Sequence, residues 1–111
     1  MNATFPQSIL LVQQADAVHA ELVSSLKKLG MSVIAVADCA AAMLGFREED
    51  IDIVMVDIDF PDDRGIDLLG KMAADPRELP LIGVSRRKSL ADVVEAVRHG
   101  ATDYLMLPPE N

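Results

Sequence analysis

The chain is short of cysteine, basic side chains and long apolar stretches. Cys39 is the single cysteine among 111 residues, so an internal disulfide is excluded and a reducing cytoplasm is the expected compartment. Lys and Arg number 10 against 18 Asp and Glu, and the net charge of −8 disfavours binding to nucleic acid or anionic membrane. No stretch reaches the roughly 20 consecutive apolar residues of a membrane-spanning helix. These absences indicate a cytoplasmic protein whose partners are other proteins.

Apolar residues are plentiful, at 50% of the sequence, and suffice for one domain with a buried core. They gather in five short runs rich in β-branched side chains, which favours buried strands. The segments between the runs have helical length and carry apolar residues at helical spacing. Strands are expected over residues 8–12, 32–37, 53–56, 81–84 and 104–107, and helices over 17–29, 40–46, 66–74 and 90–99.

Apolar stripes mark the faces on which these helices are expected to pack. The first helix is capped by Asp16 and closed by Gly30, and the fourth is capped by Ser89. The stripes consist of Val18, Leu22, Leu26 and Leu29 in the first helix, Leu68, Leu69 and Met72 in the third, and Leu90, Val93, Val94 and Val97 in the fourth.

Alternating strands and helices predict right-handed crossovers, and therefore a doubly wound α/β domain with a parallel sheet between two helical layers. A fifth helix is missing after the last expected strand. One sheet face should then be covered mainly by the first helix, with apolar surface left over. We expect this surface to be covered by a continuation of a longer protein or by a partner chain.

The central run ends at Asp57, within IDIVMVDIDFPDDRG over residues 51–65. Asp59 follows two residues later, and Pro61 and Gly65 break the chain beyond it. In an open parallel sheet, ligands and chemistry lie at the carboxyl ends of the strands. A carboxylate there can accept a phosphoryl group, bind a hard cation or cap the following helix.

Four motifs resemble the receiver domains of two-component response regulators. They are SILLV, VMVDIDFPDDRG with a proline four and a glycine eight residues after the aspartate, LPLIGVS and GATDYL. The likeness covers nearly the whole of residues 1–111, which we interpret as one receiver-like domain of a longer protein. It implies a CheY-like sheet with strand order 2-1-3-4-5. It also implies that Asp57 is the phosphoacceptor position, Ser85 a phosphoryl contact and Tyr104 the aromatic switch position.

Three positions depart from the family pattern. The acidic pair that holds Mg²⁺ in the family is replaced by Gln13 and Gln14, and the lysine that contacts the phosphoryl group is replaced by Leu107. A cation would depend on Asp57, with the backbone carbonyl of Asp59 at most. Loss of the lysine removes a charge-assisted contact worth about 1.5–3 kcal/mol. The resemblance therefore implies an atypical receiver with an incomplete phosphorylation site and no resident metal or other cofactor.

Such a domain would be a signalling module that acts through protein contacts, not an enzyme. Its expected partners are a histidine kinase, an output domain or a partner chain, and the face of the fourth helix and fifth strand could form a homodimer. The main alternative is a working phosphoreceiver that uses Asp57 with Mg²⁺.

A more remote alternative is a haloacid-dehalogenase-like phosphatase. The segment VDIDF offers Asp57 as nucleophile and Asp59 as acid/base. In that family the motif lies on the first strand, and a later lysine and acidic pair are needed; here it lies on the third strand and the late strands supply neither.

A basic cluster follows Ser85. Arg86 stands where the family usually has a small residue, and it could pair with Asp57 and fill the space of the missing metal and lysine, as could Arg64 or Arg87. The simplest alternative is that the run Arg86-Arg87-Lys88 is a solvated loop. The remaining polar residues have simpler interpretations: His19 and His99 as solvated helix positions, Asp59 as a loop-capping or exposed residue, and Cys39 as a small buried residue.

Overall fold

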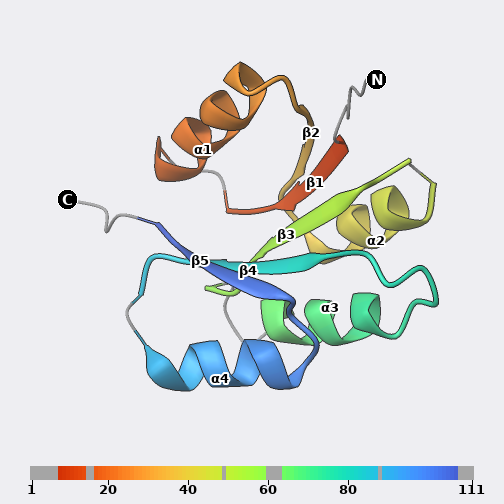
Figure 1. Ribbon diagram of the computed structural model, residues 1–111, viewed down its shortest axis with the longest axis vertical. Coiled ribbons are helices and arrows are strands. Elements are labelled where there is room, and N and C mark those ends of the chain that lie inside the picture. Colours follow the sequence, from red (N-terminus) through yellow and green to blue (C-terminus); the bar gives the residue numbers. More distant parts are fainter. Residues whose placement is uncertain (1–7, 15–16, 49, 60–63, 88, 108–111) are drawn as a thin grey trace, which may run out of the picture.

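The computed structural model describes residues 8–14, 17–48, 50–59, 64–87 and 89–107, called the described residues below. Within them, five strands alternate with four helices (Figure 1). The strands are β1 (Ser8–Val12), β2 (Ser32–Val36), β3 (Ile53–Asp57), β4 (Leu81–Ser85) and β5 (Asp103–Met106). The helices are α1 (Ala17–Lys28), α2 (Cys39–Glu48), α3 (Arg64–Ala73) and α4 (Leu90–Arg98).

The five strands form one parallel sheet in the order β2-β1-β3-β4-β5. Strand β1 lies inside the sheet, where Leu10 is paired with Ile34 of β2 on one side and with Val54 of β3 on the other. Strand β3 is likewise paired on both sides, which explains why its sequence is a continuous apolar run instead of an alternating one. The predicted doubly wound fold and strand order are confirmed.

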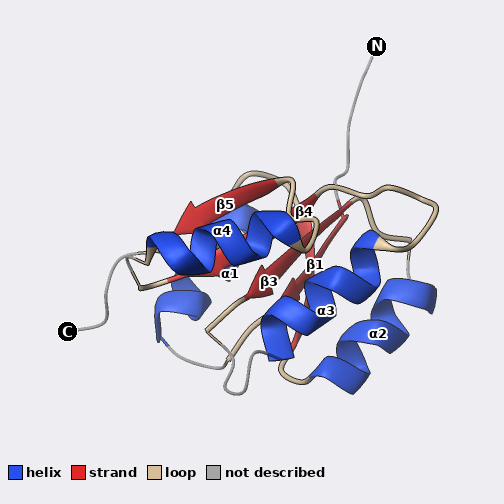
Figure 2. Ribbon diagram, turned by 90° about the horizontal axis from the view of Figure 1, so that it is seen from below, coloured by secondary structure: helices blue, strands red, loops and turns tan. Residues whose placement is uncertain are grey.

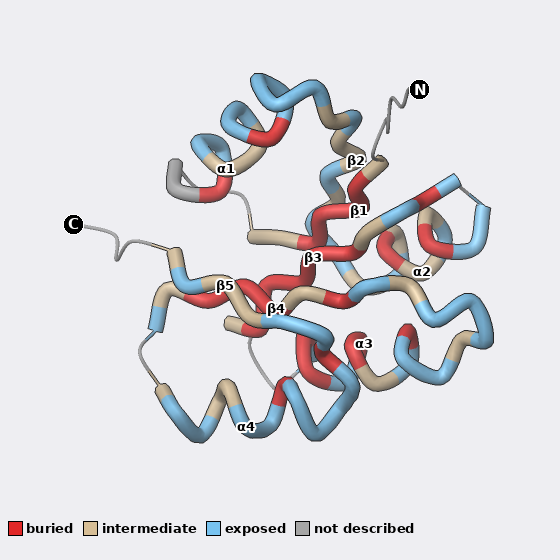
Figure 3. The backbone as a smooth tube through the Cα atoms, viewed as in Figure 1, coloured by how far each residue is buried: buried red, intermediate tan, exposed pale blue. Residues whose placement is uncertain are grey.

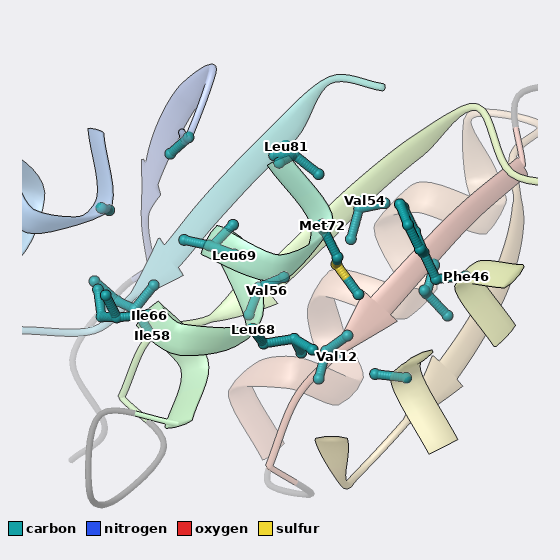
Figure 4. Packing of buried hydrophobic residues seen from close by; sticks show 14 of the residues in the cluster. Val12, Phe46, Val54, Val56, Ile58, Ile66, Leu68, Leu69, Met72 and Leu81 are labelled. Carbon is teal, nitrogen blue, oxygen red and sulfur yellow. The ribbon is translucent and has the colours of Figure 1, made fainter. Parts of the chain in front are cut away.

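Helices cover the two faces of the sheet unequally. Helices α2, α3 and α4 lie on one face and α1 lies on the other (Figure 2). Adjacent residues of one strand point to opposite faces, so Leu10 packs toward α2–α4 while Leu11 packs toward α1. The larger core fills the first face (Figure 4), with Val12, Phe46, Val54, Val56, Ile58, Ile66, Leu68, Leu69, Met72 and Leu81 among its members.

The face under α1 is less completely covered. Its buried core is small, and the residues that extend it toward β5 are only half-buried, as the burial colouring of the strands shows (Figure 3). This agrees with the expectation that the first helix covers that face. The buried members are Ile9, Leu11, Leu26, Met55 and Val84, and the half-buried ones include Ile53, Ile82, Leu105 and Leu107.

Helix α4 packs through a different face from the predicted one. Leu90, Val94 and Val97 are 78%, 45% and 54% exposed, whereas Ala96 is fully buried and Val93 is half-buried. The small side chain of Ala96 lets α4 lie close to the elements packed against it. The apolar face of α4 is wider than the part that those elements cover. The predicted packing face is therefore wrong for three of its four residues.

The C-terminal end of α1 is a second difference between the structure and the sequence prediction. Leu29 was assigned to the apolar stripe but is 73% exposed, because α1 ends at Lys28. Gly30, with φ +87°, then reverses the chain and donates its N–H to the Lys27 carbonyl at 3.0 Å. Asp16, Pro61 and the side chain of Val18 lie outside the described residues. Each described helix falls short of the length and apolar character required to cross a bilayer.

Candidate functional site

Asp57 is the last residue of β3 and is buried at the carboxyl edge of the sheet, with 1% of its surface exposed. The neighbouring strand β4 fixes its position, because Asp57 is paired with Val84 and the next N–H, that of Ile58, donates to the Val84 carbonyl at 2.9 Å. Removing a carboxylate from water at this position costs several kcal/mol of free energy unless the protein supplies hydrogen-bond donors or a counter-charge.

The protein supplies those donors from three directions. Oδ1 accepts a hydrogen bond from the Asp59 backbone N–H at 2.8 Å. Oδ2 lies 3.4 Å from the Gln14 backbone nitrogen, 3.3 Å from Gln14 Nε2 and 3.4 Å from His19 Nε2. Both carboxylate oxygens are thus occupied by groups of the chain itself, from the end of β1, from α1 and from the loop after β3.

His19 overturns a prediction from sequence. It was expected to be solvated, yet it is 1% exposed and lies beside Asp57. The signal was present in the sequence, because His19 precedes Leu22, Val23 and Leu26 at helical spacing, and these apolar residues form the face that α1 packs against the sheet. The predicted stripe of Val18, Leu22, Leu26 and Leu29 left His19 out, which is why His19 was expected on the solvent side of the helix.

Asp59 forms a second cluster of hydrogen bonds next to the first. Its carboxylate, with a side-chain exposure of 9%, accepts from Ser85 Oγ at 2.8 Å, from the Arg86 backbone N–H at 2.9 Å and from Arg87 Nε at 3.1 Å. Asp59 is therefore neither exposed nor a simple loop cap. Ser85, which is fully buried, donates its hydroxyl hydrogen to Asp59 and accepts from the Arg87 N–H at 3.0 Å.

Arg87, named above as an alternative to Arg86, extends this second cluster to α4. Its Nε pairs with Asp59, and its Nη2 lies 3.4 Å from Asp92 Oδ2 in the first turn of that helix. The hydrogen bond to the Asp59 carboxylate raises the pKa of Arg87. Since Arg87 is largely exposed, the pair contributes little stability on its own. A contact between the Arg86 guanidinium and Asp57 stays a prediction.

Tyr104 and Leu107, which occupy family positions on the β5 side, both pack as apolar residues. The Tyr104 ring lies over Gly83, where an added Cβ would stand 3.2 Å from the ring, and its buried hydroxyl has no hydrogen-bond partner among the described residues. Leu107 packs against the core under α1, and its N–H donates to the Ser85 carbonyl at 2.7 Å. Where the family has a lysine, this side chain belongs to the apolar layer.

The phenol of Tyr104 is expected to titrate above its ordinary pKa of 10.0. Burial raises the pKa of Tyr104, and the nearby Ser85 hydroxyl opposes the shift to a smaller extent. The resulting contribution to stability is full below about pH 10 and is lost as the pH rises through the higher native pKa. Tyr104 is the protein's one tyrosine and there is no tryptophan, so tyrosinate absorbance measures this group directly. A native midpoint at or below that of the urea-unfolded protein would contradict the assignment.

The donor set suits a divalent cation poorly. Gln14 Nε2 lies 3.3 Å from Asp57 Oδ2 and 3.4 Å from the Asp59 carbonyl oxygen, the two groups on which a cation at this site would depend. An amide placed between two acceptors must present its NH₂ group, because its oxygen would be repelled there. The described residues contain no group of three His, Cys, Asp or Glu side chains that could hold a metal ion. Gln13 Oε1 is a buried acceptor without a hydrogen-bond partner among the described residues, as is the Tyr104 hydroxyl oxygen.

Comparison with known proteins identifies this arrangement. Residues 9–110 match the family model of the response regulator receiver domain. The chain belongs to this family. Receiver domains are generally non-enzymatic signalling domains of two-component systems, where they interact with histidine kinases and output domains.

Curated relatives and solved receiver domains agree with this assignment. The chain is 30% identical over 100 residues to the regulatory protein LuxO of Vibrio vulnificus (strain YJ016), and 30% identical over 105 residues to the DNA-binding response regulator MtrA of Mycolicibacterium smegmatis. These matches cover 90% and 95% of this chain, but only 22% of LuxO and 46% of MtrA. The chain therefore spans less than half the length of either relative.

A solved receiver domain provides the structural comparison. It belongs to the sensor histidine kinase PA1611 of Pseudomonas aeruginosa PAO1 and has a magnesium ion coordinated in its active site cleft. The two chains are 25% identical with a TM-score of 0.81, and the match covers 96% of this chain and 88% of the other.

Proposed function

We propose that this receiver domain acts through protein–protein contacts and that its phosphorylation site is incomplete. The observation that carries the proposal is the Gln14 amide, which bridges Asp57 Oδ2 and the Asp59 carbonyl at 3.3 and 3.4 Å. Where a working site needs a cation to offset the charge of an incoming phosphoryl group, this pocket has a neutral hydrogen-bond donor. The partners are a histidine kinase, an output domain or a second chain, and the contacts with them need no Mg²⁺.

Crowding at the reacting oxygens supports the same proposal. Phosphorylation forms an oxygen–phosphorus bond on Asp57 and adds three negatively charged or polar oxygens beside it. Oδ2 already has three nitrogen atoms within 3.4 Å, and Oδ1 accepts a 2.8 Å hydrogen bond. A phosphoryl group would have to displace Gln14 or His19, and Leu107 supplies no charge to stabilise it.

A working phosphoreceiver is the second candidate, and it is supported by the residue types of Ser85 and Tyr104 at the family's phosphoryl-contact and switch positions. The PA1611 receiver, of similar fold, holds magnesium in its cleft. The phosphatase alternative has less support. Its acid/base candidate, Asp59, is engaged by Ser85 and Arg87 and is not free to exchange a proton with substrate.

Intact mass after incubation with a small phosphodonor, with and without Mg²⁺, tests the proposal. We expect no gain of a phosphoryl group by the natural protein, and a Mg²⁺-dependent gain by the variant Gln13→Asp/Gln14→Asp/Leu107→Lys, which restores charge at the three family positions. The same triple variant carrying Asp57→Asn is the control for the labelled residue. Mg²⁺-dependent labelling of the natural chain that disappears in Asp57→Asn would establish the phosphoreceiver instead.

A further inference from the structure

We propose that Asp57 and Asp59, although only two residues apart, anchor different helices through two separate sets of side-chain contacts. Asp57 is tied through Gln14 and His19 to helix α1, and Asp59 is tied through Ser85 and Arg87 to the β4–α4 side. In this arrangement His19 is the positioning residue of Asp57. The inference rests on the proposed function in one respect, which is that Asp57 stays unphosphorylated.

The first step is the division of hydrogen bonds. Gln14 and His19 approach Asp57 Oδ2, whereas Ser85 Oγ, the Arg86 N–H and Arg87 Nε all bind the Asp59 carboxylate. Two contacts do link the residues: the Asp59 backbone N–H donates to Asp57 Oδ1 at 2.8 Å, and Gln14 Nε2 lies 3.4 Å from the Asp59 backbone carbonyl. Both involve the backbone of Asp59 and not its carboxylate. Removing the charge of one aspartate should therefore disturb one set of partners and spare the other.

The second step is the closure of the β1–α1 connection. Gln14 follows the end of β1 by two residues, and His19 lies in the first turn of α1. Both contact the same oxygen of Asp57, Gln14 at 3.3 Å and His19 at 3.4 Å. One carboxylate oxygen thus joins the two ends of the connection, so the start of α1 is fixed by Asp57 as well as by its own packing.

The third step is the small number of other anchors on α1. Among the described side chains of this helix, only His19 and Leu26 are buried, and Leu22 and Val23 are half-buried. A buried imidazole costs free energy unless it finds a polar partner, and Asp57 is a buried carboxylate with the matching need. Their contact at 3.4 Å meets part of this need for both groups, so the loss of either is expected to loosen the N-terminal half of α1.

Helix α4 provides the contrasting case. Arg87 links the Asp59 carboxylate at 3.1 Å to Asp92 at 3.4 Å, and Ser89 caps the same helix by accepting from the Asp92 N–H at 3.2 Å. The start of α4 is therefore connected to Asp59, as the start of α1 is connected to Asp57. The chain offers a matched pair of conservative variants, Asp57→Asn and Asp59→Asn, that differ in which helix they should affect.

Amide hydrogen exchange resolved by residue tests the division. In Asp57→Asn and in His19→Gln, we expect exchange in the first half of α1 to accelerate about tenfold while α4 is unchanged. In Asp59→Asn, we expect the first turn of α4 to accelerate and α1 to be unchanged. The double variant His19→Gln/Asp57→Asn should exchange no faster in α1 than either single variant, because both remove the same contact.

Ring resonances of the two histidines give a readout that general destabilisation would not reproduce. The His19 signals should shift in Asp57→Asn and stay in place in Asp59→Asn, with exposed His99 as the internal reference. The proposal is overturned if both aspartate variants loosen both helices alike, or if Asp57→Asn leaves the His19 signals unmoved. If Asp57→Asn does not fold, Gln14→Ala replaces it, with the same expectation for α1 and the same rejection if α1 is unaffected. Phosphodonor labelling of the natural chain would refute the proposed function without changing these exchange results.

Discussion

Replacement of Gly65 by alanine is expected to destabilise the protein by about 3 kcal/mol or more. Gly65 lies in the first turn of α3, where an added Cβ would overlap the Asp57 carbonyl oxygen and lie 2.9 Å from the Ile58 Cα. Both are backbone atoms of the strand end that positions the site, so they cannot swing aside as the end of a flexible side chain could. The helix or the strand end must move, and the carboxylate of Asp57 would move with it.

The same helix contains the matched control. An alanine Cβ at Gly70 would meet its nearest neighbour, His99 Cδ2, at an ordinary 3.6 Å. Because alanine favours the helix over glycine, Gly70→Ala is expected to stabilise the protein by about 0.5–1 kcal/mol. Urea unfolding of the two variants measures both changes. Equal unfolding midpoints for the two variants would show that the approach of α3 to the end of β3 is not as tight as the distances require.

Truncation of Phe46 to alanine should have an effect of similar size, about 3–5 kcal/mol of unfolding free energy. The Phe46 side chain is 2% exposed in the larger core between α2 and the sheet (Figure 4), and the Arg77 guanidinium carbon lies 4.2 Å from the ring centre. The variant loses the buried ring, leaves a cavity and removes the cation–π contact. The hydrogen bond from Arg77 Nη2 to the Phe46 carbonyl, at 2.8 Å, can persist because it does not involve the side chain.

Leu44→Ala, in the same helix, is the control for this prediction. Leu44 is 56% exposed, so its truncation is expected to change the unfolding free energy by less than about 0.5 kcal/mol. Since the loss at Phe46 approaches the whole stability of an ordinary domain, Phe46→Leu is included and should cost less than about 1.5 kcal/mol. A Phe46→Ala variant as stable as Leu44→Ala would show that this ring is not part of the core.

The fold could be predicted from the sequence because its signals are local. Each strand is a short apolar run bounded by turn residues, and the predicted strand boundaries differ from the observed ones by one residue at most. Helix α2 begins one residue earlier and ends two residues later than expected, since capping marks a helix end less sharply than apolar spacing marks its middle. The strand order followed from the family resemblance, and the observed pairing of the strands confirms it.

The partners within the site could not be predicted in the same way. The sequence identified Asp57, Gln14 and Ser85 as occupants of one edge of the sheet, and the structure brings them there. The sequence did not indicate that the Ser85 hydroxyl would donate to Asp59, or that Arg87 would pair with Asp59. His19 was missed because a histidine on a helix carries no sign of its partner until the helix is rotated against the sheet.

The sequence by itself therefore determined the elements, the parallel sheet, the family and the absence of the family's acidic pair and lysine. Only the tertiary structure decided that Asp57 faces α1, that Asp59 faces α4, and that the apolar stripe of α4 stays largely exposed. The physical reason is one of range. Apolar periodicity acts over three or four residues along the chain, whereas Gln14 and Asp57 are 43 residues apart and meet only because β1 lies beside β3.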